Sequence, residues 1–517
     1  MAPTKCQPVL ARHNREILMD LSNVPSFFTP SLSRFLAQKH KFHIGGEWVD
    51  AHSGETMAVE DPATGLHLAT VPAGGKADVD KAVAAARRAF EDGPWPKLSP
   101  IERGKLITKL ALRIEDLADE LAEIEAIDGG KPLLFARHSD MIQTSVTYHY
   151  MAGWASKLNG EQIQLAGGGD FHAYTIRQPV GVAGLILPWN FPQVLLAYKL
   201  APALAAGCTV VIKPAEQTPL STIRLLQIIE EVGFPAGVVN LVTGSGEAAG
   251  AAIAEHPDVD KVAFTGSTEV GKLVARASLG NMKRLTLELG GKSPMIVFPD
   301  ADLERTIPGI AGAGFYHQGQ VCTAGTRIYA HKSIHDRLLE GIAEHGAKMT
   351  AGHPLQPGTQ FGPLISKERL DRVSEFVEEG RRAGADVWSG GKRIGNAGYF
   401  IEPTILANTN PSMTVVKEEI FGPVLCAMSF DDDDLDVIAR AANDTPYGLA
   451  ASIWTTNLSV AHKMAGLIKA GNVWINTHSA FDSALPFGGA KQSGWGRECG
   501  FEAMRAYTEI KAVCAAL

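Results

Sequence analysis

Three residues of this sequence carry side chains that suit covalent chemistry, namely Cys322, Glu288 and Asn190. Cys322 stands in a polar, glycine-containing segment after a predicted helix, where a thiol can face a cleft and act as a nucleophile. Glu288 ends an apolar strand and precedes Gly290-Gly291, which allow another backbone to approach closely. Asn190 is the strongly polar group of an apolar stretch, and its amide can donate a hydrogen bond into a pocket. The alternatives are a buried thiol, a solvent-facing strand residue and an asparagine bonded to its own turn.

Glycine-rich and charged segments at the ends of predicted strands favour a phosphate-bearing ligand. The loop Val242–Gly250 has the spacing GxGxxxG instead of GxGxxG, so by itself it is a weak dinucleotide signal. In Phe264–Thr268 a strand leads into a helix whose first backbone N–H groups can hold a phosphate. Two charged segments complete the set, Val211–Glu216 and Lys417–Phe421.

The elements that must position these residues form two α/β series. Near-continuous Val, Ile and Leu runs alternate with helical patterns, which predicts parallel sheets covered on both faces. The first series has strands at 181–187, 208–213, 238–242, 261–265 and 285–289, with helices at 193–206, 220–232, 248–255 and 268–279. The second has strands at 295–298, 326–330, 424–430, 450–454 and 472–476, with helices at 303–316, 334–349, 435–443 and 458–468. Before them we expect a small β-meander over 41–72 and helical segments over 77–91 and 101–127.

Composition restricts the class of protein. The chain has 517 residues, of which 45% are hydrophobic and 20% charged, as in a globular protein of several domains. Its formal net charge of −8 gives no electrostatic reason to bind nucleic acid or an anionic membrane surface. The longest charge-free stretch, 178–198, contains three prolines and so does not predict a membrane-spanning helix.

The cysteines favour a reduced, cytoplasmic protein without a metal site. They are scattered, with no CxxC pair and no zinc-type spacing: Cys6, Cys208, Cys322, Cys426, Cys499 and Cys514. The N-terminus has no apolar core of signal-peptide type. We therefore expect residues 1–33 to form a weakly ordered extension, with a transit peptide as the alternative.

Taken together and in this order, the motifs resemble those of the aldehyde dehydrogenase superfamily, in its hydrolytic, NAD(P)-dependent branch. The strings are PWNFP, KPAEQTP, FTGST, LELGGKSP, GQVC, EEIFGPV and PFGGAKQSG, and the resemblance runs from about His40 to Val513. It implies that Cys322 is the nucleophile, that Asn190 and the Cys322 backbone N–H form an oxyanion hole, and that Glu288 is the general base. Lys199 lies at the family's position for a proton-relay lysine; the alternative is a lysine on a helix surface. The mechanism requires no metal.

The resemblance also implies a site for NAD. Lys213 and Glu216 match residues that hold the adenosine ribose, and a carboxylate beside the 2′-hydroxyl would repel a 2′-phosphate, which favours NAD over NADP. Ser267 matches the pyrophosphate contact, Glu419 the nicotinamide-ribose ligand and Phe421 a residue beside that ring. The other expected cofactor contacts are Leu187, Pro188, Trp189, Gly246, Gly250, Phe264 and Gly266.

The implied architecture has three parts. These are a Rossmann-like NAD-binding domain of residues 34–160 and 180–290, an α/β catalytic domain of residues 291–497, and a small β-unit for bridging and oligomerisation of residues 161–179 and 498–517. Because this unit has alternating, strand-like segments whose edges need covering, we expect a homodimer or homotetramer.

The substrate is expected to be aromatic. The family's tunnel positions correspond to Phe191, Tyr198, Tyr316, Phe481 and Phe487, with Leu485 near the mouth, and an aromatic slot prefers a flat, apolar aldehyde. The strings HQGQVCTAG and WINTHSAFDSALPFGGAKQSG resemble the phenylacetaldehyde dehydrogenases more than the betaine-aldehyde or semialdehyde branches. His317 replaces the asparagine that usually precedes QGQ in the family.

Other functions remain open at this point. Other aliphatic or semialdehyde substrates would use the same residues. A CoA-acylating dehydrogenase typically lacks the glutamate base, so Glu288 argues against that class. A structural protein that kept the fold without the chemistry, or a nucleotide-binding module without catalysis, would not need Cys322, Glu288 and Asn190 together.

Overall fold

A computed structural model describes residues 27–517; residues 1–26, which hold Cys6 and most of the expected N-terminal extension, lie outside the described part. Helix α1 (Pro30–Leu36) begins inside the expected extension and runs past its end at residue 33. Thr29 caps this helix by accepting a hydrogen bond from the Leu32 backbone N–H, and Leu32 and Phe35 are buried. The chain is therefore ordered several residues earlier than we expected, because Leu32, Phe35 and Leu36 form an apolar helical stripe that begins before residue 34.

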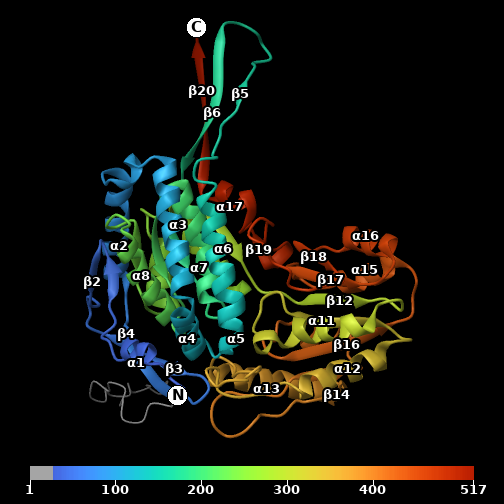
Figure 1. Cartoon of the computed structure of the whole chain (residues 1–517). Helices are drawn as coiled ribbons and strands as arrows, with labels where there is room; N and C mark the ends of the chain where they lie inside the picture. The colour runs from blue at the N-terminus through green and yellow to red at the C-terminus, as the bar shows by residue number, and fades with distance from the viewer. Residues whose placement is uncertain (1–26) are drawn as a thin grey trace, which may run out of the picture.

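The first domain is built on an eight-stranded sheet with the order β19-β11-β10-β7-β8-β9-β1-β2. The five strands from β11 to β9 are parallel, and the strands at either edge are antiparallel to their neighbours. The parallel strands are rich in Val, Ile and Leu because helices cover both faces of the sheet (Figure 1). The bounds are β1 (Phe42–Ile44), β2 (Glu47–Val49), β7 (Val182–Ile186), β8 (Thr209–Lys213), β9 (Val239–Leu241), β10 (Lys261–Thr265), β11 (Arg284–Glu288) and β19 (Gly494–Trp495).

Most helices of this domain follow the predicted pattern, but the helices over 133–135 and 141–152 were not predicted. The helices are α2 (Lys76–Glu91), α3 (Pro100–Asp116), α4 (Ala118–Gly129), α5 (Leu133–Phe135), α6 (Met141–Ala152), α7 (Pro192–Ala206), α8 (Leu220–Val232), α9 (Ala251–Glu255) and α10 (Thr268–Ala277). The helical segment expected over 101–127 is two helices, because the backbone leaves helical geometry at Leu117. The expected single meander is also wrong: β1 and β2 extend the large sheet, whereas β3 (Thr56–Asp61) and β4 (Leu66–Pro72) form a separate pair.

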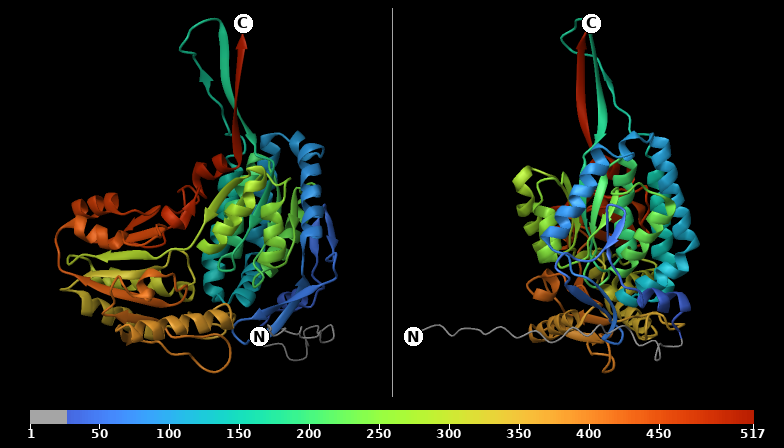
Figure 2. Two further views of the ribbon diagram at one scale, coloured as in Figure 1. Left: turned by 180° about the vertical axis from the view of Figure 1, so that it is seen from behind. Right: turned by 90° about the vertical axis from the view of Figure 1, so that its left-hand side faces the viewer.

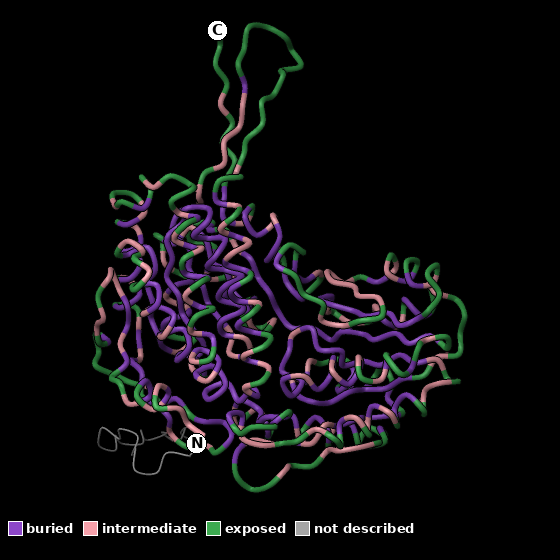
Figure 3. Tube along the Cα trace, in the orientation of Figure 1, coloured by how far each residue is buried: buried purple, intermediate pink, exposed green. Residues whose placement is uncertain are grey.

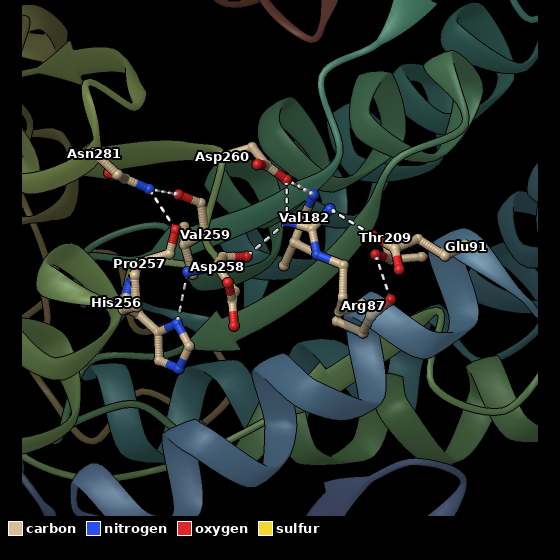
Figure 4. A network of polar contacts seen from close by, with 11 residues as sticks. Arg87, Glu91, Val182, Thr209, His256, Pro257, Asp258, Val259, Asp260 and Asn281 are labelled. Atoms are coloured by element: carbon tan, nitrogen blue, oxygen red, sulfur yellow. Dashed lines mark hydrogen bonds and ion pairs between the residues drawn. The ribbon is translucent and has the colours of Figure 1, made fainter.

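A polar network joins α2 to the start of two central strands (Figure 4). The Asp260 carboxylate accepts hydrogen bonds from the Val182 backbone N–H at 2.7 Å and from the Arg87 guanidinium at 2.5 Å. Arg87 also donates to the Asp258 carbonyl, and Asn281 donates to the Val259 carbonyl at 3.0 Å. These bonds hold β7 and β10 side by side at their amino ends. Because the two strands are parallel, their carboxyl ends lie next to each other at the same edge of the sheet.

The second domain is built on a seven-stranded sheet with the order β14-β15-β16-β13-β12-β17-β18. Its strands are β12 (Ser293–Val297), β13 (Gly325–His331), β14 (Asp386–Ser389), β15 (Thr404–Ala407), β16 (Val424–Phe430), β17 (Ala450–Trp454) and β18 (Asn472–Ile475). Its helices are α11 (Leu303–Phe315), α12 (His335–Ala347), α13 (Lys367–Arg382), α14 (Thr414–Lys417), α15 (Leu435–Asn443) and α16 (Leu458–Leu467). All strands except β14 run parallel to their neighbours.

A three-stranded antiparallel arm projects from the body, as Figures 1 and 2 show. It consists of β5 (Gln162–Ile163), β6 (Phe171–Pro179) and β20 (Thr508–Ala516), and most of its residues are exposed (Figure 3). Both segments of the expected bridging unit contribute strands to it. The start of the C-terminal segment instead forms α17 (Gly500–Ala506), which packs on the core of the first domain.

No helix among residues 27–517 has the length and apolar character that crossing a membrane would need.

Candidate active site

Cys322 lies in the loop between α11 and β13 and lines two cavities, one of about 600 Å³ and one of about 450 Å³. The loop is tightly coiled before the cysteine, since His317, Gln318 and Gly319 all have a positive φ. A side chain at position 319 would collide with the Gly422 carbonyl. The loop therefore presents the thiol where the two cavities meet.

Gly290 and Gly291, which follow β11, allow the Cys322 backbone and the Glu419 carboxylate to lie close to this strand end. A side chain at Gly291 would strike the backbone carbonyl of Cys322, and one at Gly290 would strike the Glu419 carboxylate. The Gly291 N–H instead donates a hydrogen bond to Glu419 at 2.9 Å. The pair Gly290-Gly291 thus allows the close backbone approach that the sequence predicted after Glu288.

Asn190 follows β7 and is buried beside the cysteine loop. Its side-chain amide donates a hydrogen bond to the Gln320 carbonyl at 2.9 Å. An amide nitrogen carries two hydrogens, so this bond fixes the orientation of the group and leaves a second donor. Asn190 also lines the 450 Å³ cavity together with Cys322.

Glu288 ends β11 and is buried, but it does not line either cavity. It lies against Gly488, where a side chain would collide with its carboxylate, and neither carboxylate oxygen has a hydrogen-bond partner. An unpartnered buried carboxylate is costly, so Glu288 is a group available to a water molecule or to a proton.

Lys199 pairs with a residue that the sequence analysis missed, Glu498, and the charges of both act on Glu288. The Lys199 ammonium is buried, donates to Thr265 Oγ1 at 2.6 Å and forms an ion pair with Glu498. This excludes the alternative of a lysine on a helix surface. Glu498 in turn is held by paired backbone hydrogen bonds with Phe487, at 2.7 and 2.8 Å. The sequence signal that could have identified Glu498 is its position as an acidic residue in the segment 496–500, which also contains two glycines and a cysteine.

Burial and like charges shift the titration of these groups. Burial and the neighbouring Glu498 carboxylate raise the pKa of Glu288 well above its ordinary value, which makes it a stronger base. Burial, with the carboxylates of Glu419 and Glu288, also raises the pKa of the Cys322 thiol. Burial raises the pKa of Glu419 to about 7. These surroundings therefore favour the neutral thiol form of Cys322.

The 600 Å³ cavity has aromatic walls. Five residues at positions that the resemblance assigns to the substrate tunnel line it, namely Phe191, Tyr198, Tyr316, Phe481 and Phe487, whereas Leu485 lines an adjoining pocket of about 200 Å³. The rings of Phe191 and Tyr316 are stacked at 6.3 Å, and Phe481 meets Phe487 edge-on at 5.7 Å. The residues lining this cavity include no lysine or arginine.

A buried ionic group lies behind the Phe191 wall. The Lys131 ammonium is 3.7 Å from the centroid of the Phe191 ring and pairs with Asp140 and with Glu125, the latter at 3.6 Å. Glu125 also accepts a hydrogen bond from the Gln193 N–H at the start of α7. This group fixes the segment that carries both Phe191 and Asn190.

The 450 Å³ cavity has the parts that a dinucleotide needs. Ser267 caps α10, whose first N–H groups and the guanidinium groups of Arg369 and Arg372 suit a pyrophosphate. Glu419 offers a carboxylate for ribose hydroxyls, and Trp189 meets Phe421 edge-on at 5.3 Å. Pro188 and Gly266 complete the predicted residues that line this cavity. The arginines on α13 had no signal in the sequence, because that helix is highly charged throughout.

Lys213 and Glu216 form an ion pair at the carboxyl end of β8. Lys213 ends β8 as the register partner of Ile186 in β7, and its ammonium lies 3.0 Å from the Glu216 carboxylate. The Gly246 N–H also donates a hydrogen bond to Glu216. The structure thus brings together the two residues expected at the adenosine ribose and a further expected cofactor contact, Gly246.

The remaining predicted cofactor contacts, Leu187, Phe264 and Gly250, do not line the 450 Å³ cavity. Leu187 and Phe264 are buried core residues, and the Phe264 ring packs so closely under Gly266 that a side chain there would collide with it. Gly250 lies in the π-helical turn 246–250 that precedes α9. His317 is buried edge-on to Phe191 at 5.6 Å, so it contacts the cavity wall from behind. Within residues 27–517 no group of three His, Cys, Asp or Glu side chains is arranged to hold a metal ion.

Residues 48–513 match the aldehyde dehydrogenase family. The chain is 48% identical over 475 residues to aldehyde dehydrogenase 1A1 of Gallus gallus, covering 92% of this chain and 92% of that protein. It is 46% identical over 474 residues to aldehyde dehydrogenase 1 of Tanacetum cinerariifolium, covering 92% and 94%. Among solved structures, an NAD+ complex of an aldehyde dehydrogenase from Bacillus cereus has a TM-score of 0.93 at 45% identity, covering 95% of this chain and 99% of that one.

Proposed function

Because this chain belongs to the aldehyde dehydrogenase family, we propose that it oxidises phenylacetaldehyde, or a related aromatic aldehyde, to the carboxylic acid with NAD as the oxidant. The observation that carries the proposal is that Cys322 lines both cavities, one aromatic and one fitted to a dinucleotide. A nucleophile between a substrate site and an oxidant site is what covalent aldehyde oxidation requires.

In the first step, the Cys322 thiol loses its proton to water in the cavity, the thiolate Sγ bonds to the aldehyde carbon, and the carbonyl π electrons move onto the oxygen, which becomes an oxyanion. The free N–H of Asn190 stabilises that charge, a contribution of roughly 3 kcal/mol for one donor in comparable sites. The hydrogen bond from Asn190 to Gln320 holds the donor in place before the charge develops.

When bound in the 450 Å³ cavity, NAD supplies the acceptor for the hydride that leaves the tetrahedral carbon. Glu419 and Phe421 would hold its nicotinamide end, Ser267 and the α10 N-terminus its pyrophosphate, and Lys213 with Glu216 its adenosine ribose. The substrate carbon is then a thioester on Cys322.

Hydrolysis needs a base, and Glu288 suits that role because its pKa is raised. Glu288 takes a proton from water, the hydroxide adds to the thioester carbon, and the carbon–sulfur bond breaks to release the acid. We assign the return of the Glu288 proton to solvent to Lys199 and Glu498, which form a buried ion pair and whose charges act on Glu288. Because Glu288 does not line the cavities, its side chain must turn toward Cys322 for this step.

The aromatic preference rests on the composition of the 600 Å³ cavity. Aromatic side chains pack well against a flat ring, whereas an aldehyde with a distal carboxylate finds no lysine or arginine on the lining. Burial lowers the pKa of His478, one of the two lining histidines, to about 4, so His478 is neutral, and the one carboxylate on the lining is Asp140. A semialdehyde that bears a carboxylate is therefore disfavoured.

We also propose a cytoplasmic homodimer or homotetramer. The two edge strands of the arm, β5 and β20, are exposed. Their unpaired backbone groups suit pairing with another copy of the chain. The five described cysteines are free thiols, as a reducing compartment would keep them.

The test is NADH formation with a panel of aldehydes at saturating NAD or NADP, with Cys322→Ala as the negative control. We expect kcat/KM for phenylacetaldehyde to exceed that for succinic semialdehyde and for betaine aldehyde at least tenfold, with NAD preferred. CoA should not increase the rate. A preference for either charged aldehyde would contradict the proposed substrate.

A further inference from the structure

One wall of the 600 Å³ cavity lacks side-chain bulk. Helix α11 lines the cavity with its small residues Pro308, Gly309, Gly312 and Ala313, whereas other parts of the lining carry large aromatic rings. A cavity of this size lies within the range of about 300–1,000 Å³ that holds drug-sized ligands, which is several times what a single-ring aldehyde fills.

The glycines of α11 differ in what requires them. A side chain at Gly309 would collide with Trp454, and one at Gly314 would collide with Leu425, so packing explains both. At Gly312 a side chain would meet nothing within 4 Å, and the backbone there is ordinary α-helix. A glycine in a helix interior costs about 0.5–1 kcal/mol relative to alanine, and at Gly312 neither packing nor conformation accounts for that cost.

We propose that Gly312 is a specificity-determining residue that keeps the cavity open for aldehydes with a body larger than one ring, such as bicyclic aromatic aldehydes. The inference rests on the proposed function, since it takes the 600 Å³ cavity as the aldehyde site. The isobutyl group of a leucine at position 312 would project into the cavity and occupy space that the larger body needs.

The test compares kcat/KM for 2-naphthaldehyde with kcat/KM for propanal in the wild-type chain, Gly312→Ala and Gly312→Leu. The matched control is Gly466→Leu: Gly466 is also in a helix, α16, with open space around it, but it is exposed and lines neither cavity. Both leucine variants replace a helix glycine by a better helix former, so melting temperatures should not fall.

We expect the naphthaldehyde-to-propanal ratio to fall at least tenfold in Gly312→Leu, less in Gly312→Ala, and to stay at the wild-type value in Gly466→Leu. An unchanged ratio in Gly312→Leu, or a wild-type chain that oxidises propanal but not naphthaldehyde, would overturn this inference alone. Failure of the wild-type chain to oxidise any aldehyde through Cys322 would overturn the proposed function, and this inference with it.

Discussion

The side-chain amide of Asn190 donates a hydrogen bond to the backbone carbonyl of Gln320, at 2.9 Å and two residues before Cys322. This bond fixes the plane of the amide, so the second N–H is oriented before substrate binds. We predict that Asn190→Ala lowers kcat/KM for aldehydes by roughly 10²–10³-fold, because one oxyanion donor is lost. Steady-state NADH formation measures this, with the melting temperature as the control for folding. A loss smaller than fivefold would remove Asn190 from the oxyanion hole.

The Cys322 thiol should titrate at a higher pH than a free cysteine. Burial, Glu419 and Glu288 all raise its pKa, so the thiolate fraction of the free enzyme keeps increasing through pH 9. We predict that alkylation of Cys322 by iodoacetamide accelerates over this whole range. Glu419→Gln removes one negative charge and should lower the thiol pKa, which makes alkylation near pH 8 faster. Equal rates in the two proteins would mean that Glu419 does not act on the thiol.

The charges of Lys199 and Glu498 should shift the pKa of Glu288, the proposed base, in opposite directions. Glu288 must be deprotonated to act; the Lys199 charge lowers its pKa and the Glu498 charge raises it. Lys199→Met should therefore move the acidic limb of the kcat–pH profile to higher pH, and Glu498→Gln should move it to lower pH. Profiles that shift the same way in both variants would exclude this electrostatic account.

The alternation of strands and helices made most of the fold predictable. Helices α8 and α15 and strands β10, β16 and β17 begin and end where the periodicity placed them, because buried parallel strands and amphipathic helices leave strong patterns. Helix α13 was missed because its charged residues mask its apolar stripe, which is Leu370, Val373, Phe376 and Val377. The break at Leu117 has no glycine or proline to signal it.

The site was predictable where a residue belongs to a motif, and not where it acts through contacts between distant segments. Cys322 and Asn190 were found from their motifs, and the structure brings them together. Glu498 lies more than two hundred residues from Glu288, whose pKa its charge raises, and Arg369 is one of many charged residues on α13. Their proximity to the site is a property of tertiary packing, which no local pattern encodes.

Cofactor preference should depend on Glu216. Its carboxylate is held by Lys213 at 3.0 Å and by the Gly246 N–H, at the position proposed for the adenosine ribose. We predict that Glu216→Ala or Glu216→Ser raises kcat/KM for NADP at least tenfold relative to NAD, because the repulsion of a 2′-phosphate is removed. The measurement is the ratio of kcat/KM for the two cofactors at a fixed aldehyde concentration. A wild-type enzyme that already prefers NADP would contradict the ribose assignment.

The most direct measurement of the central claim is the mass of the protein trapped in mid-reaction. Glu288→Gln, mixed with phenylacetaldehyde and NAD, should release NADH up to one equivalent per active site and then stop, since hydrolysis lacks its base. Intact-protein and peptide mass spectrometry should then find the phenylacetyl group on Cys322, and no adduct in the Glu288→Gln/Cys322→Ala double variant. Steady turnover at the wild-type rate, or a burst without any acyl group on Cys322, would contradict covalent catalysis at this sulfur.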